Sequence, residues 1–165
     1  MNTVMTERAT ALAERLEQGA RALASFAATL TDTEWSTPCS ATDQRTVGVV
    51  VHHVASIYPL EIQVAQLVAA GKPVTDVTWD VVAQINAGHA TENAGTTKQA
   101  ALDLLARNSA AAAAAIRAFS DADLAQAVPV SLYGGAPVTC QFILEDHAVR
   151  HSYHHLAKIR KTLGR

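Results

Sequence analysis

Apolar side chains recur at intervals of three and four residues along four long stretches of this chain, which is the spacing of one buried face of an α-helix. In the first stretch Leu12, Leu16 and Leu23 share a face, and Glu14 and Arg15 lie on the other side. The pattern predicts four long helices, at Thr6–Leu30, Thr46–Ala70, Thr97–Phe119 and Thr139–Leu163. Because long helices joined by short connections pack as neighbours, we expect an all-α chain folded as an antiparallel four-helix bundle.

The segments between these stretches carry residues that end helices and form turns. The polar residues 31–45 predict a loop, and Gly71 to Pro73 predict the end of the second helix. Pro59 lies inside that helix, where it removes the bond to the carbonyl of Ala55 and predicts a kink. One short extra helix is predicted at Trp79–His89.

Two further short segments precede the last helix. Ser120 is suited to cap a helical turn over the sequence SDADLAQA. Residues 128–138 follow, and their turn residues Gly134, Gly135 and Pro137 predict irregular structure.

Composition and charge narrow the classes of function. The 165 residues suit one domain, 1–165, and the low aromatic content of 5% favours close-packed helices over sheets. The net charge of −2 gives no basis for binding nucleic acid or an anionic membrane. No uninterrupted apolar run reaches the roughly 18 residues of a membrane span. The N-terminus leads directly into a charged amphipathic stretch without a signal peptide, so we expect a cytoplasmic protein.

The seven histidines are unevenly distributed. His52 and His53 are adjacent in the second predicted helix, and His89 stands apart. The last predicted helix carries the remaining ones, His147, His151, His154 and His155. A cluster of this kind on two helices raises the question of which imidazoles face the core.

A helical wheel separates the inward histidines from the outward ones. At roughly 100° per residue, His155 falls within the arc of the apolar residues of the last helix and His151 borders it, and His147 and His154 lie further out. On the second helix the same geometry places His53 at the inner edge and turns His52 outward. The inward set is therefore His53, His151 and His155.

These three histidines match the requirements of a divalent-metal site. Imidazoles four residues apart on one helix can chelate a single ion, and a third imidazole from a facing helix completes three protein ligands. Three ligands leave coordination positions for water or substrate, which is typical of catalytic sites. Nitrogen ligands suit zinc, nickel, copper or iron(II) better than calcium or magnesium, with zinc as the first candidate and nickel or iron as alternatives.

Two other interpretations of the histidines remain open at this point. His147 or His154 can act as a fourth ligand and close the site, which would give a non-catalytic metal- or ligand-binding module. Alternatively, all the histidines are solvated along the bundle surface and no metal binds.

The same residues resemble a known family. RTVGVVVHHV, residues 45–54, resembles the second-helix signature of the DinB-like superfamily, which includes the mycothiol-dependent maleylpyruvate isomerase type of protein. Arg45 stands where the family often has tryptophan, eight residues before a buried metal histidine that corresponds to His53. HAVRHSYHHLAKIRK, residues 147–161, resembles the last-helix signature, which aligns His151 and His155 with the other ligands. INAGHA, residues 85–90, is also similar to a segment of some members.

The resemblance implies both a fold and a chemistry. It implies a metal-binding four-helix bundle that uses a low-molecular-weight thiol, and therefore a thiol-dependent S-transferase or isomerase type of enzyme acting on a small-molecule substrate. It also implies a homodimer. The alternative from another functional class is a non-catalytic, stress-associated dimeric module.

A few residues outside the triad are candidates for supporting roles. Glu61 lies on the apolar side of the second helix, about 80° from His53, and can serve as a partner of a ligand or as a general base. We favour a partly exposed acid at the point where the kinked helix leaves the core. Asn86 and His89 are candidate catalytic or pocket residues, with helix capping at the surface as the alternative. Cys39 and Cys140 form no CxxC pair, so we expect reduced thiols, with a disulfide as the open alternative.

Overall fold

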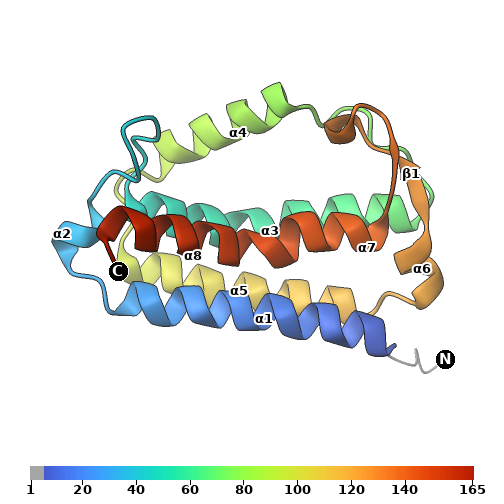
Figure 1. The fold of residues 1–165 in the computed structure, drawn as a ribbon, viewed down its shortest axis with the longest axis horizontal. Coiled ribbons are helices and arrows are strands. Elements are labelled where there is room, and N and C mark those ends of the chain that lie inside the picture. The colour runs from blue at the N-terminus through green and yellow to red at the C-terminus, as the bar shows by residue number, and fades with distance from the viewer. Residues whose placement is uncertain (1–5) are drawn as a thin grey trace.

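Four long helices form the body of the molecule in a computed structural model that describes residues 6–165. The first three are α1 (Glu7–Ala28), α3 (Val47–Ala69) and α5 (Lys98–Arg117). The fourth is a continuous helical segment built from α7 (Cys140–Ile143), the π-helix η2 (Leu144–Val149) and α8 (Arg150–Leu163). The prediction of an all-α four-helix bundle is confirmed (Figure 1).

Each of these helical segments begins directly after a threonine that caps it. The side chains of Thr6, Thr46, Thr97 and Thr139 each accept a hydrogen bond from the backbone N–H three residues later. This bond satisfies one of the N–H groups that a helix start leaves without an internal partner. Local sequence therefore sets where the long helices begin.

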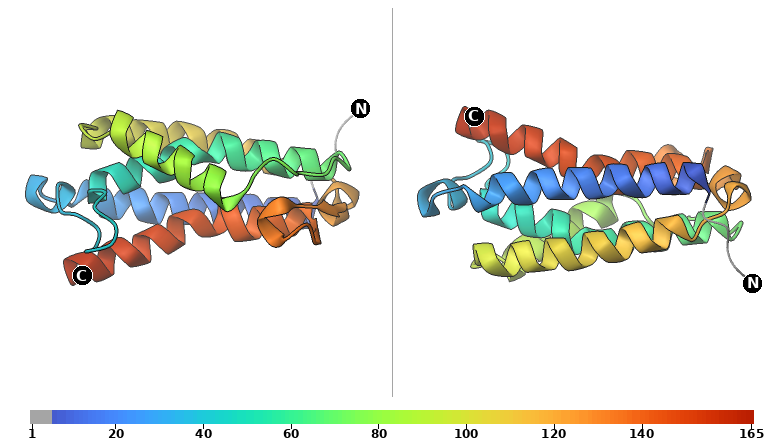
Figure 2. Two further views of the ribbon diagram at one scale, coloured as in Figure 1. Left: turned by 90° about the horizontal axis from the view of Figure 1, so that it is seen from above. Right: turned by 90° about the horizontal axis from the view of Figure 1, so that it is seen from below.

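The helices form a ring in which α1 packs against α5 and α8, and α3 packs against α5 and the α7–η2 segment. Figures 1 and 2 show that α1 and α8 run in one direction and α3 and α5 in the other, so neighbours α3 and α5 are parallel. A parallel neighbour requires the chain to return along the bundle. That return is made by α4 (Trp79–Glu92), the short extra helix that the sequence predicts.

Helix α4 lies outside the ring and contacts α3 (Figure 2). It has no buried residue, and its exposed apolar side chains include Trp79, Val81 and Ile85. The indole nitrogen of Trp79 donates a hydrogen bond of 3.1 Å to the carbonyl of Leu132. Helix α4 is thus an outer layer that covers one side of the bundle.

Helix α3 continues through Pro59 for its full length of 23 residues. The proline leaves the carbonyl of Ala55 without its usual partner in the helix. Asn108 of α5 satisfies it by donating a hydrogen bond of 2.9 Å from its side-chain nitrogen. The hydrogen bond that Pro59 removes from α3 is thus replaced by one from α5, which fixes the two helices against each other.

Two segments predicted as irregular contain short regular elements. Residues 31–45 include α2 (Asp32–Trp35), whose start is a capping box between Thr31 and Glu34. After α6 (Asp121–Ala125), capped by Ser120 as predicted, β1 (Ala127–Pro129) pairs antiparallel with β2 (Pro137–Thr139). The 3₁₀ turn η1 (Ser131–Tyr133) lies between the two strands. Such short elements carry too few residues for a periodic pattern to reveal them.

Helix α3 is the central helix of the core. Among the described residues it alone is long and apolar enough to cross a membrane, with a mean hydropathy of 1.2. However, 61% of that window is buried inside the protein, as is usual for the core helix of a bundle. Its burial is explained by its packing against α5 and the α7–η2 segment.

Candidate metal centre

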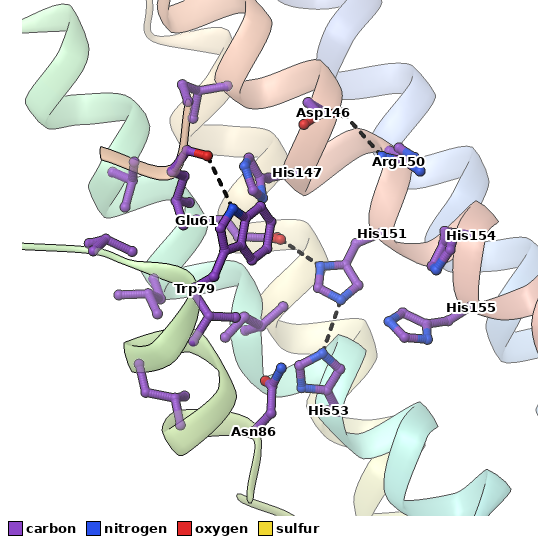
Figure 3. Close-up of a pocket in the computed structure, with 18 of the residues that line it drawn as sticks. His53, Glu61, Trp79, Asn86, Asp146, His147, Arg150, His151, His154 and His155 are labelled. Atoms are coloured by element: carbon purple, nitrogen blue, oxygen red, sulfur yellow. Dashed lines mark hydrogen bonds and ion pairs between the residues drawn. The ribbon is translucent and has the colours of Figure 1, made fainter. Parts of the chain in front are cut away.

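His53, His151 and His155 meet between α3 and α8, as Figure 3 shows. One ring nitrogen from each lies within 4.8 Å of those of the other two. The Nε2 atoms of His53 and His151 are 3.1 Å apart, and the rings of His151 and His155 are stacked with centroids 4.9 Å apart. The structure therefore brings together the three histidines that the helical wheel selects.

Burial keeps two of the three imidazoles, those of His53 and His155, uncharged. His53 is 4% exposed and His155 is 7% exposed. Burial, reinforced by the neighbouring His151, lowers the pKa of His53 to about 3 and that of His155 to about 2. Both imidazoles are therefore neutral at pH 7, which is the form in which histidine binds a metal.

Glu61 orients one member of the cluster. The Nδ1–H of His151 donates a hydrogen bond of 2.5 Å to Oε1 of Glu61, which leaves the Nε2 lone pair of that ring free to point at the cluster. Glu61 is only 7% exposed, so the prediction of a partly exposed acid is wrong. The helix does not leave the core after Pro59, and its buried residues continue to Val68. The partner that makes burial of the carboxylate tolerable, His151, comes from another helix.

The geometry fits a divalent metal held by three nitrogens. With bonds of 2.0–2.1 Å, tetrahedral coordination separates ligand nitrogens by roughly 3.3 Å. The 3.1 Å between His53 and His151 is close to this separation. In addition, Nδ1 of His155 is buried without a hydrogen-bond partner among the described residues, which is a costly arrangement in a group with no ligand role. The donor set thus suits the nitrogen-preferring metals.

No fourth protein ligand joins the cluster within residues 6–165. Instead, Nε2 of His147 is hydrogen-bonded to the hydroxyl of Tyr133, and the two atoms are 2.9 Å apart. The ring of His154 stacks edge-on against His155 at 5.1 Å between centroids. Both line the same pocket as the cluster. His154 is exposed and lies further out, as the wheel predicts, whereas His147 is half-buried beside the pocket. Three protein ligands are the pattern of an open rather than a closed site.

The cluster lies at one end of a pocket of about 280 Å³ between α3, α4 and the last helical segment. Its wall is largely apolar and comes from both sides, with α3 and α4 supplying Ile57, Leu60, Val64, Trp79, Val82 and Ile85. Because α4 is the outer layer of the fold, it adds a second wall to the bundle surface and forms a partly open apolar pocket. A small molecule with an apolar portion matches this lining.

The remaining candidates from the sequence separate into two groups. Asn86 lines the pocket, as proposed. His89 does not line it; its Nε2 lies 2.9 Å from Nδ1 of His52. His52 is half-buried under α4 rather than fully outward, because α4 brings His89 against it. This pair packs beside the cluster, with the His89 ring 5.5 Å from that of His53.

Several pocket residues escape the sequence reasoning. Arg45 lines the pocket and is held by Asp43, whose Oδ1 accepts from Nε at 2.8 Å and whose Oδ2 accepts from Nη2 at 2.7 Å. Asp146 and Arg150 also line it, and Tyr133 bonds to Asp146 beside it. The positions Arg45 and Asp43 stand in a predicted loop, where periodicity carries no signal. The signal that could have identified them is the pair of opposite charges, Asp43 and Arg45, directly before the start of α3.

The two cysteines lie apart from the pocket. Cys39 and Cys140 are both buried free thiols, so the expectation of reduced cysteines agrees with the fold. Burial raises the pKa of Cys140 to about 12 and also raises that of Cys39. Neither thiol lines the pocket.

Comparison with known proteins agrees with this architecture. The structure is similar to that of YfiT from Bacillus subtilis, described as "a probable metal-dependent hydrolase with an unusual four-helix bundle topology". The TM-score is 0.74 at 21% identity, over 98% of this chain and 89% of that one. No curated protein sequence matches the chain. Residues 15–159 of the chain match the sequence model of the DinB superfamily. A match of this extent, over most of the bundle and all three clustered histidines, shows that the chain belongs to the DinB superfamily.

Proposed function

We propose that the protein is a divalent-metal-dependent enzyme that activates a small nucleophile for attack on a substrate with an apolar portion. One observation carries the proposal. Three converging imidazoles lie on a pocket with a largely apolar wall, and no fourth protein ligand joins them within the described residues. A structural metal site does not require a pocket of this size, whereas a catalytic one does.

The roles of the residues follow from their contacts. His53, His151 and His155 would hold the ion, and a bound divalent cation would supply the positive charge that favours the deprotonated form of a sulfur or oxygen nucleophile. Glu61 fixes the ring orientation of His151 through their hydrogen bond. The apolar wall excludes water from the substrate, which strengthens electrostatic interactions in the pocket.

The first specific candidate is thiol transfer, in which a low-molecular-weight thiol attacks an apolar electrophile. It is the chemistry that the family resemblance implies. The positions of the cysteines are consistent with it, because neither Cys39 nor Cys140 lines the pocket and the sulfur would have to come from a small molecule. An isomerase that uses the same thiol is a variant of this candidate.

The second candidate is hydrolysis, and a specific observation favours it. The second carboxylate oxygen of Glu61, Oε2, is buried without a hydrogen-bond partner among the described residues, and Glu61 lines the pocket. A carboxylate oxygen in that position is suited to accept a hydrogen bond from an attacking water and so to orient it. The similarity to YfiT, described as a hydrolase, points the same way.

A product analysis separates the two candidates. Zinc-, nickel- and iron(II)-loaded protein is incubated with an aryl halide and an activated aryl ester, each with and without cysteine, glutathione or mycothiol. Products are identified by mass spectrometry. Thioether products that require both metal and thiol support thiol transfer, and metal-dependent ester cleavage without thiol supports hydrolysis.

The control is the matched protein with His53, His151 and His155 replaced by alanine, under identical conditions. Any rate that this variant retains does not depend on the site. If the loaded wild-type protein forms no more of either product than the triple variant does with every electrophile and thiol, the enzymatic proposal is wrong.

A further inference from the structure

A second polar cluster lies on the pocket away from the three clustered histidines. The hydroxyl of Tyr133 donates a hydrogen bond of 2.6 Å to Oδ2 of Asp146 and lies 2.9 Å from Nε2 of His147. Nη1 of Arg150 donates to the other carboxylate oxygen of Asp146 at 3.1 Å. Asp146, His147 and Arg150 all line the pocket (Figure 3).

The π-helix η2 explains why His147 faces the pocket at all. In a regular α-helix His147 would sit about 40° from His151, further from the apolar face. Between Leu144 and Val149 the helix takes the wider π form, which turns by less per residue and so brings His147 more nearly into line with His151. Wider turns of this kind are concentrated at functional sites.

The hydrogen bonds define which nitrogen of His147 carries the proton. Tyr133 has one hydroxyl proton, and burial, with the hydrogen bond to Asp146, raises the pKa of Tyr133, so that proton is retained. The proton is directed to the carboxylate, which is the closer and charged acceptor. The contact of 2.9 Å then requires Nε2 of His147 to be the donor to the tyrosine oxygen.

It follows that Nδ1 of His147 carries the lone pair. Within residues 6–165 no protein group hydrogen-bonds to this atom, and it is not among the buried polar atoms shut off from solvent. A neutral imidazole with a free lone pair beside a pocket is the form required of a general base. The tyrosine and the carboxylate behind it are placed to stabilise the imidazolium that forms when the lone pair takes a proton.

We propose that His147 is the general base of this pocket, with Tyr133 and Asp146 as the positioning residues that hold its tautomer. The assignment rests on the proposed function and deepens it. As the nucleophile forms its bond to the electrophile, its S–H or O–H proton passes to Nδ1 of His147. The bond between the electrophilic atom and its leaving group breaks, and the leaving group takes the electron pair and then the proton from Nδ1, so no oxidant or further reactant is needed.

The charges around His147 are compatible with this role. Glu61 on α3 and Asp146 favour its protonated form, and His151 and Arg150 disfavour it. Burial is the largest influence and lowers the pKa of His147, so the ring is neutral at pH 7 and able to accept a proton.

Nitrogen-15 NMR of histidine side chains in the zinc-loaded protein tests the assignment without any substrate. The wild-type spectrum is expected to show His147 protonated at Nε2 and unprotonated at Nδ1. Tyr133→Phe should abolish this preference and give a mixture of tautomers. Tyr153→Phe is the matched control, since Tyr153 donates to the carbonyl of Arg15 on the other side of the last helix. A proton on Nδ1 in the wild type, or an unchanged spectrum in Tyr133→Phe, would overturn the assignment.

Kinetics of the same proteins provides the second test. His147→Gln should lower kcat by about 10²–10⁴-fold with bound zinc unchanged, and should remove the acidic limb of the pH–rate profile. Tyr133→Phe should lower kcat by roughly 10-fold. A His147→Gln protein that retains the wild-type kcat refutes the base. Absence of turnover in the wild type would instead refute the proposed function, and the tautomer spectrum would still decide the state of His147.

Discussion

At the residue scale, the site depends on a contact between two helices that neither helix reveals alone. Glu61 is unfavourable in a core by itself, and His151 without an anchor can rotate. Their hydrogen bond of 2.5 Å resolves both problems at once. The carboxylate is made tolerable by its partner, and the imidazole is held with Nε2 toward the cluster.

Removal of this contact should weaken metal binding without abolishing it. Glu61→Ala is expected to lower zinc affinity by about 10–100-fold, because His151 loses the partner that fixes its tautomer. Glu61→Gln keeps an acceptor oxygen, so its zinc affinity should lie between that of Glu61→Ala and that of the wild type. Zinc affinity is measured by competition with a chromogenic chelator.

The matched control for this prediction is Glu145→Ala. Glu145 is an acid of the last helical segment whose partner, Arg15, lies on α1. This variant should bind zinc as the wild type does. An unchanged zinc affinity in Glu61→Ala would show that the contact has no role in ligand orientation.

The sequence predicts a site residue correctly where the direction of its side chain is set within a single regular helix. His53, His151 and His155 follow from the helical wheel because α3 and α8 have regular turns where these residues lie. The direction of His147 does not follow from the wheel, because the π-helix that changes it cannot be recognised from the spacing of apolar residues. The burial of Glu61 depends on a partner 90 residues away. Long-range partners are invisible to local periodicity.

At the element scale, α3 is positioned by a close approach to α2. A Cβ at Gly48 would lie 2.3 Å from Cε2 of Trp35, which is closer than real contacts allow. Trp35 is also fixed by a hydrogen bond of 3.2 Å from its indole nitrogen to the carbonyl of Thr96. Glycine is therefore required here, close to the start of the helix that carries His53.

Two glycine substitutions in helices should have opposite effects. Gly48→Ala is expected to destabilise the protein by about 1–3 kcal/mol, because Trp35 must move. Gly88→Ala in α4 meets no atom within 4 Å and should stabilise the protein by roughly 0.5–1 kcal/mol through helix propensity. Urea unfolding followed by circular dichroism measures both. A stabilising Gly48→Ala would show that α2 does not pack on α3 as described.

The start of each long helix was predictable, but its neighbours were not. Thr6, Thr46, Thr97 and Thr139 are local signals, and each acts as the cap. The parallel pairing of α3 with α5 arises from the return path through α4, which the lengths of the connecting segments do not specify. The role of α4 as the pocket wall depends on this same arrangement.

At the scale of the whole molecule, the buried histidines link folding stability to pH. The pKa of His53 is about 3 and that of His155 about 2 in the folded state, against roughly 6.5 in the unfolded chain. The unfolded state therefore binds more protons between these values. Stability is fully present above about pH 7 and falls as the pH drops below about 6.5.

The metal-free protein should accordingly lose stability in mild acid. Between pH 7.5 and pH 5 we expect a loss on the order of 2 kcal/mol for each of these two histidines. Urea unfolding at the two pH values measures it. The double variant His53→Gln, His155→Gln should show a much smaller difference, and an equally large difference there would assign the effect to other groups.

The central claim is that the bundle holds one divalent metal on three histidines. The most direct test is elemental analysis by plasma mass spectrometry of protein purified without an affinity tag, beside His53→Ala, His151→Ala and His155→Ala. We predict about one equivalent of metal in the wild type, loss of it in all three variants, and near-native helix content throughout. A wild type that contains no metal and takes up neither zinc, nickel nor iron(II) on titration would contradict the account.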